Sequence, residues 1–225
     1  AAPSVGRAEL ALAFDRSSAS SVELHVEGRN FYPPLLADIA AATSSVHINQ
    51  FGFRPGLVGD RFADVLVAKA GEGVPVRLIV DRLGSDPERG AQELYRRLTG
   101  AGIQVCVARA TQPRAPLGPL GAGGATGWNL RGLGHIDHRK FVIVDGRIGW
   151  VGGAGIEDHF QDGRFHDLFV RVAGPVVGQL QLVFLAGFRW LGGSIPAAEI
   201  ETLFPQVEAG AAGVPAVVLH NAPGR

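Results

Sequence analysis

Residues 134–146 read GHIDHRKFVIVDG. The second half of this stretch has the β-branched and aromatic residues of a strand, and Asp145-Gly146 is a pair typical of a tight turn. Side chains alternate between the two faces of a strand, so His138 and Lys140 point the same way. We therefore expect one face to present an imidazole beside an ammonium group, with the Asp145 carboxylate at the end of the strand.

Lys140 stands out because lysine is rare in this chain. The sequence holds 21 Lys and Arg residues, and the lysines are Lys69 and Lys140 alone. A buried ammonium on an apolar strand needs a partner. One interpretation is a cation that binds phosphate. The other is an edge-strand lysine that reaches solvent and pairs with Asp145. Spacing alone favours neither.

Strand-like and helix-like segments alternate along the chain. The patterns predict strands at 22–26, 44–53, 74–81, 102–108, 148–151 and 165–172, and helices at 31–42, 60–70, 87–99, 175–191 and 196–207. This order predicts an α/β fold with a mostly parallel or mixed sheet and helices on both faces. Ligands gather at the carboxyl ends of the strands in such sheets, which makes Gln50 a candidate polar group of a site. His47, on the same strand, fits a core histidine better.

Composition narrows the class of protein. The formal net charge is zero, which argues against a protein that wraps nucleic acid but not against a local basic groove. Cys106 is the single cysteine and excludes an intrachain disulfide. No apolar stretch has the length of a transmembrane helix. A single cysteine and the lack of such a stretch do not determine the cellular compartment. The chain has no Met, which indicates a processed chain or a piece of a longer protein.

Residues 111–133 differ in composition from the rest of the chain. They are rich in Gly, Pro and Ala and lead directly into the stretch with His138. A stretch of this length without regular structure is typical of a lid, a binding loop or disorder. One expectation is a flexible lip on which Trp128 and Leu130 touch an acyl chain or a membrane surface. The other is a plain surface loop.

The spacing His138-x-Lys140-x4-Asp145, followed by Gly152-Gly153, resembles the signature of the phospholipase D superfamily. The flanking text HRKFVIVDGRIGWVGGAGIEDHF and FHDLFVRVAGPVV is most similar to the cardiolipin synthase branch. The resemblance extends from about residue 22 to residue 190. It implies a lobe that contributes one such motif to a site shared with a second, similar lobe.

This resemblance implies phosphodiester cleavage through a covalent intermediate. His138 would attack phosphorus, Lys140 would stabilise charge on the phosphate oxygens, and Asp167 would accept a hydrogen bond from the imidazole. Asp145 would support the geometry of the motif. No metal or other cofactor is implied. The predicted site comprises the catalytic residues His138, Lys140, Asp145 and Asp167 and the phosphate-binding residues Gly152, Gly153 and Gln50. The family usually has Asn where this chain has Gly155, which removes a side-chain donor.

The domain organisation follows from the same comparison. We expect an N-terminal arm at 1–20, one lobe at 21–210 and the start of a second lobe at 211–225. The last assignment rests on a short repeat, because Val217-Val218-Leu219-His220 echoes Val22-Glu23-Leu24-His25.

Three functions fit these observations. The first is phosphatidyl transfer or hydrolysis of phospholipids, with this chain supplying one of two half-sites. The second is a homodimeric nuclease of the same superfamily. The third is a non-catalytic module that keeps the fold. A metal site formed by His135, Asp137 and His138 is a rival interpretation with a thin ligand set.

Overall fold

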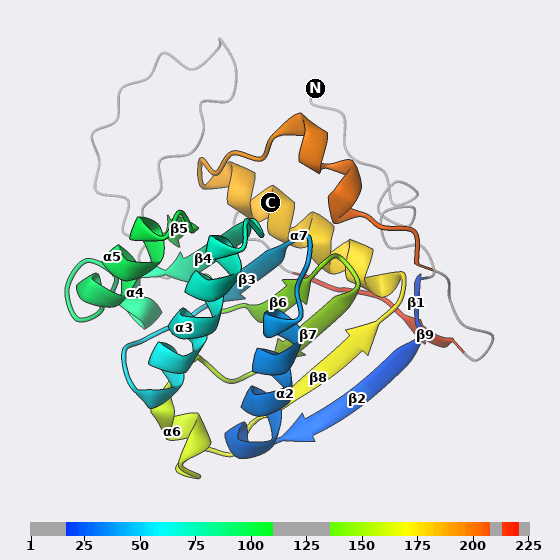
Figure 1. Cartoon of the computed structure of the whole chain (residues 1–225). Coiled ribbons are helices and arrows are strands. Elements are labelled where there is room, and N and C mark those ends of the chain that lie inside the picture. Colours follow the sequence, from blue (N-terminus) through cyan, green and yellow to red (C-terminus); the bar gives the residue numbers. More distant parts are fainter. Residues whose placement is uncertain (1–16, 110–135, 208–212, 221–225) are drawn as a thin grey trace, which may run out of the picture.

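A computed structural model describes residues 17–109, 136–207 and 213–220 (Figure 1). Seven strands form one mixed sheet in the order β2-β8-β7-β6-β3-β4-β5. Its strands are β2 (Ser21–Val26), β3 (Val46–Gln50), β4 (Val76–Asp81), β5 (Gln104–Ala108), β6 (Lys140–Val144), β7 (Ile148–Gly152) and β8 (Leu168–Ala173). The predicted α/β fold with helices on both faces of a mixed sheet is confirmed.

The sheet is parallel on one side and antiparallel on the other. β3, β4 and β5 run parallel, as their alternation with helices predicts. β6, β7 and β8 follow as antiparallel neighbours, and β2 pairs with β8 at the outer edge instead of joining β3. The motif strand β6 therefore lies in the centre, between β3 and β7.

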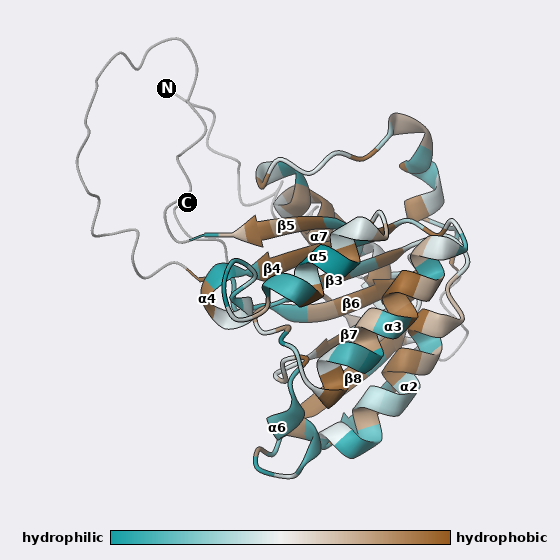
Figure 2. Cartoon of the chain, turned by 60° about the vertical axis from the view of Figure 1, so that its left-hand side comes forward, coloured by the Kyte–Doolittle hydropathy of each residue, from teal (hydrophilic) through white to brown (hydrophobic). Residues whose placement is uncertain are grey.

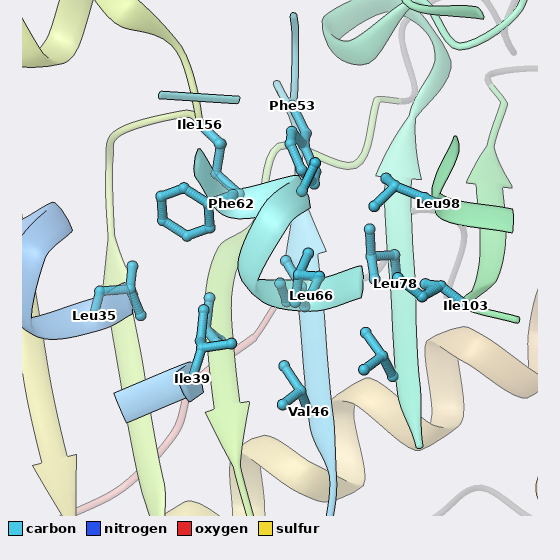
Figure 3. Close-up of a cluster of buried hydrophobic side chains, with 14 of the residues drawn as sticks. Leu35, Ile39, Val46, Phe53, Phe62, Leu66, Leu78, Leu98, Ile103 and Ile156 are labelled. Atoms are coloured by element: carbon cyan, nitrogen blue, oxygen red, sulfur yellow. The ribbon is translucent and has the colours of Figure 1, made fainter. Parts of the chain in front are cut away.

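One face of the sheet is covered by α2 (Gly28–Ala40), α3 (Leu57–Gly71) and α5 (Gln92–Gly100). Their apolar residues recur three or four positions apart, as in Phe31, Leu35 and Ile39, and these side chains are fully buried. Figure 3 shows Leu35, Ile39, Phe62 and Leu66 packed over Val46 and Leu78 of the strands. In Figure 2 the strands are largely hydrophobic, whereas these helices carry hydrophilic residues outward.

The other face is covered by α7 (Val176–Trp190), seen behind the sheet in Figure 1. Phe184 and Phe188 of this helix pack against Ile79, Phe141 and Ile143 of the strands. His47 lies here at 0 % exposure, stacked on Phe184 and hydrogen-bonded to Gln181. It is the core histidine expected, and burial lowers its pKa to about 3.

Several predicted boundaries are wrong. The helix expected at 87–99 begins later, as α5 at Gln92, after turns at residues 87–91, and an unpredicted short helix, α4 (Arg82–Ser85), precedes it. The helix expected at 196–207 is two 3₁₀ turns, η3 (Ala197–Glu199) and η4 (Glu201–Leu203). Ile200 and Leu203 pack against the core under α7, and their spacing of three residues matches one 3₁₀ turn.

The chain ends of the described region pair with each other. β1 (Ser17–Ala19) and β9 (Val214–Ala216) form a two-stranded antiparallel sheet. Residues 217–220, expected to form a strand by their echo of 22–25, are not a strand. Val218 instead donates its N–H to Gln179 of α7 and packs against the core of this lobe. The start of a second lobe at 211–225 stays a prediction.

The remaining helix of the described residues is α6 (Asp158–Gln161), which follows β7. None of the helices in the described ranges combines the length and the apolar character needed to cross a membrane. The loop expected at 111–133, with Trp128 and Leu130, lies entirely outside those ranges, as do residues 1–16 of the arm expected at 1–20.

Candidate active site

The predicted site residues other than Asp145 gather at one end of the central strands. Gln50 at the end of β3 is in register with Lys140 at the start of β6. Asp81 ends β4 alongside, in the parallel half of the sheet. On the other flank Gly152 ends β7 opposite Phe169, the second residue of β8. The carboxyl ends of three strands thus meet the amino ends of two, as the strand order predicts.

His138 and Lys140 are in direct contact at this end of the strands. The Lys140 ammonium donates a hydrogen bond of 2.9 Å to the carbonyl oxygen of His138, and its Nζ lies 3.2 Å from each ring nitrogen. Lys140 is 6 % exposed on a central strand, whereas His138 is exposed to solvent. The alternative of an edge-strand lysine paired with Asp145 is therefore wrong. The imidazole can meet a substrate, with a cation fixed behind it.

The electrostatics of the pair favour a neutral imidazole. Partial burial and then the charge of Lys140 lower the pKa of His138, against the opposing charges of Asp81 and Asp137. A neutral ring keeps a lone pair for attack, so a lowered pKa extends the nucleophilic form to lower pH.

Burial and the charges of carboxylates act in opposite directions on the lysine. Burial lowers the pKa of the Lys140 ammonium, and four carboxylates oppose this shift: Asp167, Glu157, Asp137 and Asp81. Lysine is a point charge with three donors, and the recorded hydrogen bonds of Lys140 Nζ are to His138, so the ammonium is suited to bind a phosphate oxygen as well.

Phe51 forms an aromatic wall of the site that sequence patterns do not reveal. Its ring centroid lies 4.6 Å from that of His138 and 5.1 Å from the Lys140 ammonium. An aromatic face at this distance attracts a cation. Phe51 directly follows β3, where the chain leaves the sheet and its side chain falls beside the motif.

The Asp81 carboxylate binds the backbone just before His138. Its Oδ2 accepts the N–H of Asp137, and its Oδ1 accepts those of Leu83 and Gly84 at the start of α4. Asp81 is 2 % exposed. The end of β4 therefore fixes the backbone that carries His138, a contact between segments 56 residues apart in sequence.

Gln50 is where the sequence places it, on the strand neighbouring Lys140. Its side chain is 0 % exposed, and neither its amide nitrogen nor its oxygen has a hydrogen-bond partner among the described residues. A buried amide without a hydrogen-bond partner is costly, and one beside the Lys140 ammonium is suited to bind a ligand.

Asp167 and Gly153 are packed together. A Cβ at Gly153 would lie 2.4 Å from the Asp167 carboxylate, so only glycine admits this approach. Asp167 accepts the N–H of Leu168, and its charge acts on Lys140. No hydrogen bond joins Asp167 to His138 within the described residues, so its predicted role in orienting the imidazole stays a prediction.

Glycine at 152 and 153 serves the close packing of β7 on β8. A Cβ at Gly152 would lie 2.4 Å from the carbonyl oxygen of Leu168, and the Gly153 N–H donates to that same oxygen. The structure thus gives both glycines a packing reason. Their predicted role in binding phosphate is a separate proposal.

Asp145 lies at the opposite end of β6 from His138. Its carboxylate accepts the backbone N–H groups of Thr43, Ser44 and Ser45 and the hydroxyls of the first two. Burial opposes its ionisation, but these N–H donors together hold its pKa below the usual range. Asp145 thus clamps β6 to the turn before β3, which fits the expected structural role.

The rival metal site has little support in the geometry. His135 lies outside the described residues, and Asp137 is engaged by Arg139, whose Nη2 lies 2.6 Å from its Oδ2. No group of three potential metal ligands is found among the residues described. Among the described residues, the arrangement brings together the His138 imidazole, the Lys140 ammonium and the Gln50 amide, which has no hydrogen-bond partner there.

Comparison with known proteins agrees with this geometry. The family described as "Cardiolipin synthase, PLD-like domain" matches residues 35–181. The chain is 32 % identical over 171 residues to the major cardiolipin synthase ClsA of Bacillus subtilis, covering 74 % of this chain and 32 % of that protein. It is 28 % identical over 193 residues to cardiolipin synthase A of Pseudomonas entomophila, covering 83 % and 37 %.

A solved structure shows the same fold. The phospholipase D family member Nuc from Salmonella typhimurium superposes with a TM-score of 0.55 at 18 % identity, covering 77 % of this chain and 96 % of Nuc. The chain spans about a third of the length of the curated relatives that it matches. By the match over residues 35–181, the chain belongs to the cardiolipin synthase-like family of phospholipase D domains.

Proposed function

We propose that this chain is one half-site of an enzyme that transfers or hydrolyses the phosphatidyl group of phospholipids. The observation that carries the proposal is the contact of exposed His138 with buried Lys140, whose Nζ lies 3.2 Å from both ring nitrogens. A neutral nucleophile beside a fixed cation is the arrangement that attack on a phosphodiester needs.

In the proposed first step, a ring nitrogen of His138 attacks phosphorus. The N–P bond forms as the P–O bond to the leaving alcohol breaks, which gives a phosphohistidine. Lys140 and the amide of Gln50 bind the non-bridging oxygens, which gain charge in the transition state. In the second step, water or a second alcohol attacks phosphorus, gives its proton to the group that protonated the leaving alcohol, and releases the imidazole as the N–P bond breaks.

The leaving alcohol needs a proton that His138 cannot give. The sequence contains one His-x-Lys-x4-Asp motif, at residues 138–145. We propose that a second phospholipase D-like lobe, on another chain or another copy of this one, supplies the general acid. Its addition would complete the site at the exposed side of His138.

The substrate class is tested by assaying a lipid and a nucleic acid in parallel. The protein is assayed against vesicles of phosphatidylglycerol and against plasmid DNA, with His138→Ala as the matched control. We expect His138-dependent turnover of the lipid and no cleavage of DNA. The zero net charge favours this result, because phosphate-backbone binding usually rests on a basic surface. Cleavage of DNA that falls steeply with salt, with no lipid turnover, would establish the homodimeric nuclease instead.

The dependence on a second lobe is tested by the order of the reaction. If two copies of this chain form the site, turnover per chain rises with chain concentration and then saturates. If another polypeptide is required, turnover appears only on its addition. Full turnover by a particle with the native mass of a monomer would contradict the half-site proposal.

A further inference from the structure

The polar and ring contacts of the His138 imidazole, among the described residues, are with Lys140 and Phe51. The Phe51 ring centroid lies 4.6 Å from that of the imidazole, with 51° between the two ring planes. No hydrogen bond joins the imidazole to a carboxylate within the described ranges. The contacts that orient this exposed ring are therefore those with a cation and an aromatic side chain.

The Lys140 ammonium lies over a face of the imidazole. Its Nζ is 3.2 Å from Nδ1 and 3.2 Å from Nε2 of His138. A point in the plane of the ring at these two distances would overlap a ring carbon, so Nζ lies out of that plane. A ring nitrogen accepts a hydrogen bond along its lone pair, which lies in the plane. The ammonium thus leaves the lone pair free for phosphorus, and the direction of the lone pair depends on how the ring is packed.

Phe51, which packs against this imidazole, is fixed by two consecutive residues of α4. The Ser85 hydroxyl donates to the carbonyl oxygen of Phe51 at 2.8 Å and accepts the N–H of Phe53 at 3.0 Å. Ser85 is 0 % exposed. A Cβ at Gly84 would overlap the Phe51 carbonyl oxygen and lie 2.8 Å from Cδ1 of its ring. Glycine therefore admits the ring, and serine holds the backbone on both sides of it.

The same turn is connected to the backbone that carries His138. Asp81 accepts the N–H groups of Leu83 and Gly84 through Oδ1, and it accepts the N–H of Asp137 through Oδ2 at 2.9 Å. Asp81 is 2 % exposed. The turn at residues 81–85 therefore holds Phe51 through one set of hydrogen bonds and the approach to His138 through another. A buried turn with both connections fixes the two rings relative to each other.

We propose that Phe51 is the positioning residue of His138, and that the turn at residues 81–85 holds the two rings in contact for attack on phosphorus. The inference rests on the proposed function. An aromatic ring against the imidazole restricts rotation of that exposed side chain. The restriction matters for the reaction, because displacing a reacting group by about an ångström can lower its rate about 100-fold.

The motion of the imidazole provides a test that needs no turnover. NMR relaxation of the His138 ring, assigned by loss of its signal in His138→Gln, gives the order parameter of the Cε1–H bond. In Phe51→Leu we expect it to fall below about 0.6, the range of flexible groups, whereas Phe51→Tyr should keep the wild-type value. Phe204→Leu is the matched control, a half-buried phenylalanine beside Gly146 at the opposite end of β6. An imidazole that is as rigid in Phe51→Leu as in the wild type would overturn the proposal, even if the enzyme turns over lipid.

Single-turnover kinetics with phosphatidylglycerol vesicles measures the effect on the reaction. We expect Phe51→Leu to slow the first step by about 10- to 100-fold with little change in KM, and Phe51→Tyr to restore the rate. A loss in Phe51→Tyr as large as in Phe51→Leu would also overturn the proposal, since the tyrosine keeps the ring.

Ser85→Ala tests the role of the turn. It leaves the Phe51 ring in place but frees its backbone, so the order parameter and the rate should fall in the same sense and by less. Circular dichroism checks the fold of every variant, and the NMR result for Ser85→Ala decides if Phe51→Leu does not fold. If the wild type turns over no lipid, the proposed function fails, whereas the positioning role still stands or falls with the motion of the imidazole.

Discussion

At the scale of residues, the site is a set of coupled charges rather than a list of separate groups. Burial and then the charge of Lys140 lower the pKa of His138, while four carboxylates oppose the lowering that burial causes in the pKa of Lys140. The lysine therefore both binds phosphate and keeps its neighbour neutral in the proposed mechanism. Substitution of either residue should change the titration of the other.

Lys140→Met tests this coupling. Without the positive charge the pKa of His138 should rise, because protonation of the ring is no longer opposed by the ammonium. Activity should fall, and the acid limb of the pH profile of the residual activity should move to higher pH. The imidazole titration of His138, followed by NMR and assigned by loss of the signal in His138→Gln, measures the shift.

Lys69→Met is the matched control, since it removes the other lysine of the chain. It should leave the titration of His138 where it is, whatever it does to stability. A His138 titration that does not move in Lys140→Met would show that the 3.2 Å approach of the two side chains has no electrostatic consequence.

At the scale of elements, one carboxylate binds the chain near each end of β6. Asp81 binds the backbone at its start, and Asp145 binds the turn before β3 at its end. Asp145 has φ of 54°, in the left-handed region that Asn and Asp tolerate better than most residues. Asp145→Asn thus keeps the backbone preference and removes the charge.

We expect Asp145→Asn to lower the free energy of unfolding by about 1–3 kcal/mol at neutral pH, the usual contribution of hydrogen bonds to a charged group. The pKa of Asp145 is depressed in the folded state, so its contribution is present above the unfolded pKa and lost as the pH falls through the folded one. Urea unfolding of both proteins at neutral and acid pH should show the difference narrowing in acid. A difference that is constant with pH would contradict the clamp.

The sequence predicted elements well where one pattern fixed them. Alternation along β6 placed His138 beside Lys140, and the run of strands and helices to β5 gave the parallel half of the sheet. The sequence patterns failed to predict the elements whose form or position depends on tertiary contacts. The edge position of β2 depends on pairing with β8, and the 3₁₀ turns near Leu203 depend on packing under α7. Phe51 and Asp81 join the site through long-range contacts that no local pattern shows.

At the scale of the whole molecule, the proposed mechanism makes this lobe one of two halves of a site. His138 is exposed at the sheet edge, Gln50 has no partner in the described residues, and the proposed general acid lies elsewhere. The relatives are about three times as long as the matched region. The central claim of the proposed mechanism is that a covalent bond forms between phosphorus and a ring nitrogen of His138.

That bond is tested most directly by acid-free rapid quench of the enzyme during turnover of phosphatidylglycerol, followed by mass spectrometry of the intact chain and its peptides. We predict a phosphatidyl adduct on the peptide that contains His138, absent in His138→Ala and reversed on addition of a competing alcohol. An adduct on any other residue, or turnover with no adduct under conditions that trap one, would contradict the account.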